Sequence, residues 1–181
     1  ENQFKFDKTK KILLVLYSFI ETEDRTPDGY LDNFSINKLI FNSTNKYLKS
    51  ISKNLKKRNV IKAQQETRYP VLENSLKKRH KSLKILNMEK PFKKIINQYN
   101  LSIHFFIGTP FFESIYLNRP TIIIYDKKIN FRLNEKFLQF IQKFKENGIC
   151  FESSIKAANF INKNYDNLNE IINFNKIKHL K

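Results

Sequence analysis

Short runs of consecutive apolar residues recur along the chain and alternate with longer segments of mixed polarity. A continuous apolar run favours a strand buried on both faces, as in a parallel sheet, because a strand with one face in water would alternate apolar and polar residues. The pattern predicts strands at residues 11–17, 59–64, 82–86, 102–107, 120–125 and 149–151.

The segments between these runs carry apolar residues at helical spacing. They predict helices at residues 35–55, 91–99, 113–118, 131–146 and 153–164, and a terminal helix that begins at Asp166. Ser35 and Ser153 are the expected N-caps, and Gly148 is the expected stop of the helix at 131–146. Between the second and third strands the sequence indicates a loop, which contains the basic stretch 77–81.

This alternation predicts an α/β fold, an open, doubly wound and mainly parallel sheet of about six strands with helices on both faces. With 181 residues and 40% hydrophobic content, the chain is expected to form a single three-layer domain over residues 1–181. Because the chain begins at Glu1 rather than Met, we expect it to be a fragment of a longer protein.

The chain is strongly basic, with 34 Lys and Arg against 17 Asp and Glu and a formal net charge of +17. Such a balance is typical of proteins that bind nucleic acid or another phosphate-bearing partner. Lysines dominate the basic set, and Asn and Ile are also abundant, which is the composition that an AT-rich genome produces. We therefore interpret the charge mainly as solvated surface, and a basic nucleic-acid-binding protein stays open as an alternative.

A single cysteine, Cys150, excludes an internal disulfide and a multi-cysteine metal site. No spacing of His, Cys, Asp or Glu indicates a metal site, and there is no glycine-rich dinucleotide or Walker pattern. The apolar run after residues 8–11 has no cleavage site behind it, and no run reaches the ~18 residues of a membrane span. The sequence therefore favours a cytoplasmic protein without metal or cofactor, with at most peripheral contact at the inner face of the membrane.

The strand expected at 102–107 runs directly into Gly108-Thr109-Pro110, and a short helix follows. In open parallel sheets, ligands lie beyond the carboxyl ends of the strands, and the free N–H groups at a helix start favour an anion such as phosphate. Gly108 would let a ligand approach the backbone, and Thr109 adds a hydroxyl; alternatively, the two residues only shape and cap the turn. His104 is interpreted as a buried core histidine rather than a catalytic base.

Three blocks of the sequence, taken in order, resemble a family of transferases encoded in bacterial surface-carbohydrate gene clusters. The first block is Arg68-Tyr69-Pro70, directly after an expected strand. The second is HFFIGTPFFES, residues 104–114, followed by Leu117 to Thr121, and the third combines Arg132 with KENGI, residues 145–149. The resemblance covers residues 11–169 and departs from the family at Ile107 and Pro110, where the family has Asn and Ser or Thr.

The resemblance implies the C-terminal half of a GT-B-like glycosyltransferase, a Rossmann-like domain that binds a nucleotide sugar without a metal. It implies substrate-binding roles for Arg68, Gly108, Thr109, Glu113 and Arg132. The two arginines would hold the diphosphate, which Arg can do bidentately, and Glu113 would accept hydrogen bonds from the ribose. The long loop 18–32, with Asp24, Arg25, Asp28 and Tyr30, would face the cleft.

The expected partners are the nucleotide-sugar donor, a carbohydrate or lipid-linked acceptor, and an N-terminal domain of the same protein, with no specific nucleic acid. The expected role is donor binding in the synthesis of bacterial surface polysaccharide or lipopolysaccharide. A catalytically inactive relative that keeps the fold stays open as a further alternative, and the sequence identifies no catalytic residue.

Overall fold

The structure is a computed structural model that describes residues 4–17, 33–62, 71–86, 90–128 and 135–168. These residues form one six-stranded sheet in the order β3-β2-β1-β4-β5-β6, and every pair of neighbouring strands is parallel. The strands are β1 (Lys11–Val15), β2 (Asn59–Lys62), β3 (Lys84–Ile85), β4 (Tyr99–His104), β5 (Thr121–Ile124) and β6 (Cys150–Phe151). The α/β class and the parallel sheet predicted from the sequence are confirmed.

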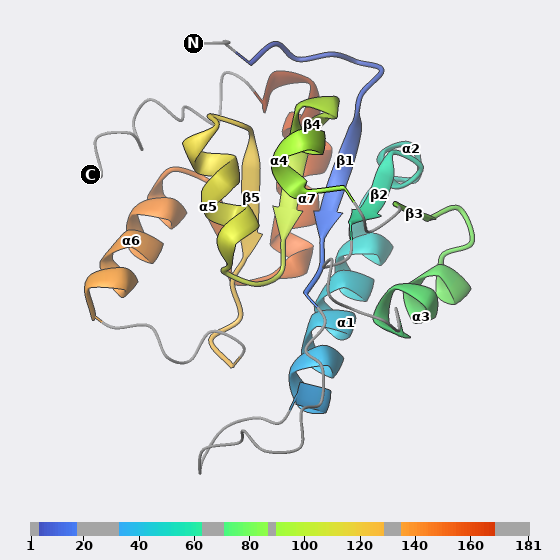
Figure 1. The fold of residues 1–181 in the computed structure, drawn as a ribbon, viewed down its shortest axis with the longest axis horizontal. Coiled ribbons are helices and arrows are strands. Elements are labelled where there is room, and N and C mark those ends of the chain that lie inside the picture. Colours follow the sequence, from blue (N-terminus) through green and yellow to red (C-terminus); the bar gives the residue numbers. More distant parts are fainter. Residues whose placement is uncertain (1–3, 18–32, 63–70, 87–89, 129–134, 169–181) are drawn as a thin grey trace.

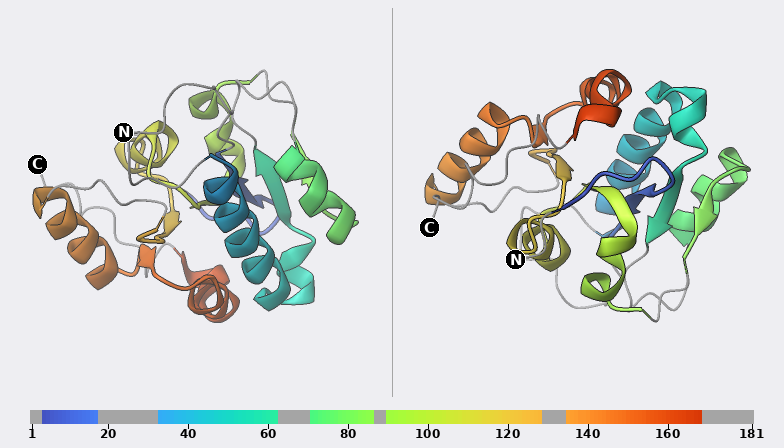
Figure 2. Two further views of the ribbon diagram at one scale, coloured as in Figure 1. Left: turned by 90° about the horizontal axis from the view of Figure 1, so that it is seen from below. Right: turned by 90° about the horizontal axis from the view of Figure 1, so that it is seen from above.

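Helices cover both faces of this sheet and make a three-layer arrangement (Figures 1 and 2). α1 (Asn33–Ser50) and α7 (Ser154–Asn164) lie side by side on one face, whereas α4 (Phe92–Ile95) and α5 (Thr109–Tyr116) lie on the other. The remaining elements are α2 (Lys53–Lys56), α3 (Val71–Arg79), α6 (Glu135–Glu146) and the 3-10 turns η1 (Ile96–Gln98) and η2 (Tyr165–Asn167). The order of strands is that of a doubly wound Rossmann-like sheet.

The central strands are buried on both faces, which explains their uninterrupted apolar sequence. Ile12 to Val15 in β1 are at most 3% exposed, and the six residues of β4 are all buried. In the register of these two strands, Leu13 pairs with Ser102 and Val15 with His104. Polar residues of β4 therefore share a face with apolar residues of β1, and their hydrogen bonds must be made inside the protein.

Several helices and strands begin or end at other residues than the sequence predicts, because contacts between distant segments outweigh the local pattern. Tyr99, expected as the end of a helix, begins β4 beside Lys11, so the strand starts before residue 102 and ends at His104. The helix expected at 113–118 begins already at Thr109. The long helix expected at 35–55 runs from Asn33 to Ser50, so Ser35 lies inside it and the prediction of Ser35 as its N-cap is wrong. α2 is a separate turn after Ser52.

The prediction of a loop between the second and third strands is wrong, because the helix α3 lies there. Leu72 and Leu76, one helical turn apart, are buried among the core residues. Between and after them stand polar residues, and the run Lys77 to Arg79 gives the segment a loop-like composition. The helix is therefore stabilised by its tertiary contacts rather than by its local sequence.

Two predicted helix ends are confirmed by their hydrogen bonds. After α6, Gly148 has φ +71° and donates to the carbonyl of Lys145, while Ile149 donates to that of Phe144. These two bonds make a Schellman motif, which needs a residue in the left-handed region. At the start of α7, the Ser153 hydroxyl accepts a hydrogen bond from the N–H of Lys156. The proposed cap Asp166 lies in η2, and residues 169–181 after it lie outside the described part.

Within the described ranges, no helix combines the length and the apolar character that crossing a membrane requires.

Candidate functional site

The candidate site lies at the carboxyl ends of β1 and β4, in the middle of the sheet. From β1 the chain proceeds toward β2 on one side, and from β4 it proceeds toward β5 on the other. The two strands are therefore neighbours whose following segments diverge. Open α/β sheets bind their ligands at such a reversal, and we call this place at the ends of β1 and β4 the crevice. Tyr17 follows β1 at this point, and Phe106 to Gly108 follow β4.

Tyr17 lies directly against Gly108. A Cβ atom placed on Gly108 would be 2.2 Å from the Tyr17 hydroxyl oxygen and 2.6 Å from Cζ of the same ring. Gly108 has φ −147° and ψ −177°, an extended conformation open to any residue. A side chain at position 108 would therefore have to displace the phenol, whereas the backbone conformation would accept one. The sequence predicts that a ligand approaches the backbone at Gly108; in the structure, the side chain that lies against this glycine is Tyr17.

The helix start after Gly108 offers few backbone donors. The N–H groups of Phe111 and Phe112 are directed at the Gly108 carbonyl, at 3.0 Å and 3.4 Å, and Pro110 has no N–H. No side chain caps α5, and Thr109 is exposed at its first position. The backbone N–H of Thr109, together with its hydroxyl, is thus the donor set that the first turn can present to a ligand.

Glu113 lies one turn into α5, half-buried, and its charge acts on Tyr17. Burial raises the pKa of the Tyr17 phenol to about 12, and the nearby carboxylate of Glu113 adds to this increase. The phenol consequently stays protonated across the physiological pH range, so that it can donate a hydrogen bond but does not serve as a base.

The rings around the turn hold it in place. The Tyr17 and Phe106 rings are 5.1 Å apart between centroids, tilted by 56°. Ile107 is 9% exposed and belongs to the core. The structure therefore places Ile107 in packing and Tyr17, Gly108 and Glu113 at the crevice.

Three of the five predicted substrate-binding residues are in the described part, and α5 brings them together: Gly108 precedes the helix, Thr109 begins it, and Glu113 is one turn along. Arg68 and Arg132 lie outside the described residues, as do the loop residues Asp24, Arg25, Asp28 and Tyr30.

His104 is a buried core histidine, as expected. It is 0% exposed, and its Nε2 lies 3.1 Å from the Ser102 hydroxyl and 3.3 Å from the Ser114 hydroxyl. The Ser102 hydroxyl is also 2.8 Å from that of Thr121. Burial lowers the pKa of His104 to about 3, so the ring is neutral. This buried polar cluster joins β4, β5 and α5 beneath the Gly108 turn.

Lys62 is a basic residue at the same edge that sequence reasoning missed. It is the last residue of β2, pairs with Val15, and is 4% exposed. Burial lowers the pKa of its amino group. In the sequence, Lys62 is marked only by its position at the end of a short apolar run, and many other lysines of this chain stand beside apolar residues.

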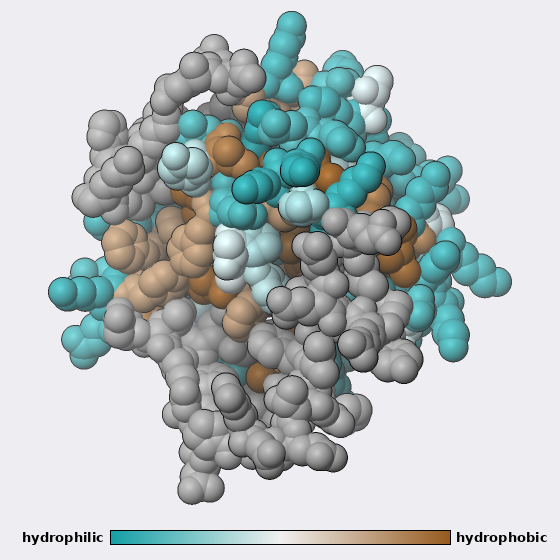
Figure 3. All heavy atoms as spheres, viewed as in Figure 1, coloured by the Kyte–Doolittle hydropathy of each residue, from teal (hydrophilic) through white to brown (hydrophobic). Residues whose placement is uncertain are grey.

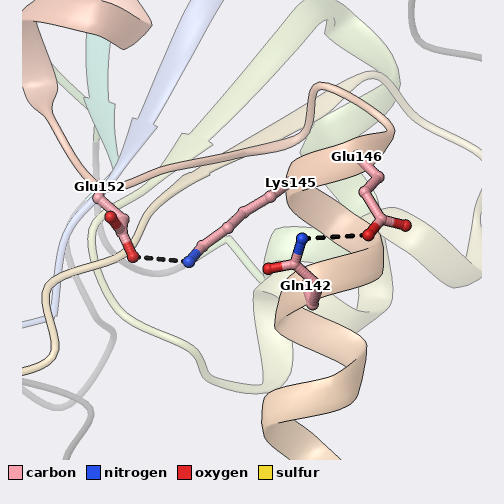
Figure 4. Close-up of polar contacts among 4 residues, drawn as sticks. All are labelled: Gln142, Lys145, Glu146 and Glu152. Carbon is pink, nitrogen blue, oxygen red and sulfur yellow. Dashed lines mark hydrogen bonds and ion pairs between the residues drawn. The ribbon is translucent and has the colours of Figure 1, made fainter.

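The third resembling block forms a salt bridge at the outer end of the sheet. Lys145 Nζ and Glu152 Oε1 are 2.6 Å apart, and Gln142 donates to Glu146 one turn away on α6, at 3.0 Å (Figure 4). The Glu152 carboxylate raises the pKa of Lys145, and the ammonium lowers that of Glu152. Lys145 and Glu152 are 30% and 53% exposed, so this pair is a surface feature.

Neither Cys150 nor the residue types that bind metals form a second candidate site in the described part of the chain. Burial raises the pKa of the Cys150 thiol to about 12, which keeps it protonated and unreactive. Among the residues that the structure describes, no group of three or more His, Cys, Asp or Glu could hold a metal ion.

Apolar side chains gather on the surface over α5 and α6 (Figure 3). Phe112 and Tyr116 on α5 are 44% and 82% exposed, and Leu138 on α6 is 45% exposed. The Phe112 and Phe137 rings meet edge to face, 6.0 Å apart, and join the two helices.

Comparison with known proteins gives one match. The model of a family described as the LIC12162 family transferase matches residues 2–170. No curated protein matches, and no solved structure matches.

Proposed function

The chain belongs to the LIC12162 family of transferases, and we propose that it is the donor-binding half of a GT-B-like glycosyltransferase that acts in bacterial surface-carbohydrate synthesis. The bound donor is a nucleotide sugar. Its diphosphate lies at the crevice between β1 and β4, with Arg68 and Arg132 on the phosphates and Glu113 near the ribose.

The observation that carries this proposal is the position of the Gly108 turn. The turn lies at the strand-order reversal of an all-parallel sheet and opens α5, so a ligand in the crevice meets the Thr109 N–H and the positive end of the helix. A transferase family supports a group-transfer reaction, and a net charge of +17 suits an anionic donor.

The proposed chemistry relies on positioned charge. As the sugar is transferred, negative charge develops on the departing nucleoside diphosphate, and fixed cations and N–H donors stabilise that charge. In this proposal the arginines and the Gly108 turn supply that stabilisation without a metal. Bidentate contact suits Arg68 better than a lysine, because the guanidinium presents two parallel donors to one phosphate.

The acceptor, a carbohydrate or lipid-linked carbohydrate, is bound by an N-terminal domain of the same protein, and the general base comes from there. The enzyme works in the cytoplasm, at the inner face of the membrane where lipid-linked acceptors are found.

Calorimetry on the full-length protein tests this proposal with UDP, GDP, CDP and CMP as probes. We expect one nucleotide to bind, and we expect Arg68→Ala to weaken it by about 1.5–3 kcal/mol, the contribution of a hydrogen bond to a charged group. Lys77→Ala is the matched control, because Lys77 is exposed on α3. Equal losses in the two variants would misplace the site, and binding of none of the four nucleotides would end the donor-domain proposal.

A further inference from the structure

We infer that Tyr17 is a ligand-binding residue, and that its hydroxyl donates a hydrogen bond to the diphosphate of the bound nucleotide sugar at the Gly108 turn. This inference rests on the proposed function and adds to it a residue that the sequence did not indicate.

The first argument is the contact between Tyr17 and Gly108. The phenol oxygen occupies the space that any other residue at position 108 would fill with its Cβ, only 2.2 Å from that position. Since the extended backbone at Gly108 does not itself need a glycine, the missing side chain makes room for this hydroxyl. The hydroxyl therefore lies at the turn where the ligand is proposed to bind.

The second argument is the state of the hydroxyl. Among the residues that the structure describes, none makes a hydrogen bond with the Tyr17 hydroxyl, and this oxygen is not sealed from solvent. Because solvent reaches this oxygen, a ligand that binds beside it can replace water as its hydrogen-bond acceptor. A ligand in the crevice would supply that acceptor.

Few other hydrogen-bond donors lie at the start of α5. Pro110 removes one N–H from the first turn of α5, and those of Phe111 and Phe112 are directed at Gly108. Beside the two proposed arginines, the start of α5 presents only Thr109 to a diphosphate, and the protonated phenol of Tyr17 adds a donor from the segment after β1. The Phe106 ring, 5.1 Å away, holds the phenol in this position.

The test compares Tyr17→Phe with the wild-type full-length protein, by calorimetry with whichever of UDP, GDP, CDP and CMP the wild type binds. Tyr17→Phe keeps the ring and its contact with Phe106 and removes only the hydroxyl. We expect at least about tenfold weaker binding, the effect of one hydrogen bond to a charged group. Tyr116→Phe is the matched control, because Tyr116 is 82% exposed on α5, and we expect it to bind as the wild type does.

Two further measurements separate binding from folding. Thermal unfolding without nucleotide should give the same midpoint for Tyr17→Phe and the wild type, so that a loss of affinity reflects the ligand. Inorganic pyrophosphate, used as a competitor, should also lose potency against Tyr17→Phe, because the inferred contact is with the diphosphate.

The outcomes distinguish this inference from the proposed function. If the wild type binds a nucleotide and Tyr17→Phe binds it equally well, the inference is wrong and the proposed function stands. Tighter binding by Tyr17→Ala than by the wild type would also overturn it, because the phenol would then block the turn. If the wild type binds none of the four nucleotides, the proposed function fails, and the inference fails with it.

Discussion

The imidazole of His80 and the side-chain amide of Asn45 are hydrogen-bonded, with 2.9 Å between Nε2 and Oδ1. His80 follows the end of α3, and Asn45 lies in the middle of α1, so this bond ties the two helices together. Both side chains are at least 90% buried. Nothing in the sequence marks Asn45 as the partner of His80, which lies among basic residues.

We expect Asn45→Ala to lower the free energy of unfolding by about 1–3 kcal/mol, because it leaves the buried imidazole without its partner. Urea denaturation measures this loss. Asn42→Ala, at an exposed position of the same helix, controls for the change in helix propensity and should cost little or nothing. Equal stability of the two variants would mean that the bond contributes nothing to the docking of α3.

We expect the stability of the protein to fall in acid partly because of His104. Its pKa in the folded state is about 3, well below the 6.5 of an exposed histidine, so the folded protein holds the ring neutral while the unfolded chain binds a proton. The contribution is therefore complete above about pH 6.5 and is lost as the pH falls toward 3, at up to about 1.4 kcal/mol per pH unit.

Unfolding by urea at pH 7, 6, 5 and 4 measures this dependence, with His104→Gln as the comparison, since Gln keeps a hydrogen-bonding group but does not titrate. The difference in stability between wild type and variant should shrink steadily with falling pH. A difference that stays constant over this range would show that His104 is not held neutral.

Replacing either of the two described glycines by alanine should destabilise the protein, but for different physical reasons. Gly148→Ala should destabilise the protein by about 1 kcal/mol, because φ +71° is strained for alanine although the nearest side-chain atom to a new Cβ is 3.8 Å away. Gly108→Ala should destabilise through collision with Tyr17, and adding Tyr17→Ala should relieve that part of the cost. A double-mutant cycle by chemical denaturation measures the coupling, and no coupling is expected between Gly148 and Tyr17.

Much of the fold follows from local pattern because the strands are short, apolar and buried on both faces. β1 and β5 could be read directly from the runs around Leu14 and Ile123. The helix α3 could not, because its buried positions Leu72 and Leu76 contribute only when β3 and α1 are already assembled around them. The start of β4 at Tyr99 likewise depends on its pairing with Lys11, far away in the sequence.

The residues of the Gly108 turn could be predicted from the sequence, but the contribution of Tyr17 to the candidate site could not. Gly108, Thr109 and Glu113 are close in sequence, so spacing alone places them around one helix start. Tyr17 follows β1, about ninety residues earlier in the chain, and nothing in the sequence around it distinguishes it from other tyrosines. Its importance emerges only when β1 and β4 are known to be adjacent.

We expect the positive charge to give only weak, sequence-independent binding to nucleic acid, since the lysines are interpreted as solvated surface. Titration of labelled duplex and single-stranded DNA at physiological salt should give dissociation constants of about 10⁻⁶ M or weaker, and they should weaken steeply with added salt. A sequence-specific constant near 10⁻⁸ M would instead favour a dedicated nucleic-acid-binding protein.

The central pairing of β1 with β4 also sets the order in which this domain can assemble. β1 is synthesised well before β4, so one of its edges receives its partner only after residue 104 has been made. Until then that apolar edge is open to wrong pairing, and closing so long a segment slows folding. In the nascent chain, α1 and β2 can pack against β1 before β4 is made, but the edge that pairs with β4 stays open. A chain truncated before β4 should therefore aggregate rather than form a smaller folded unit.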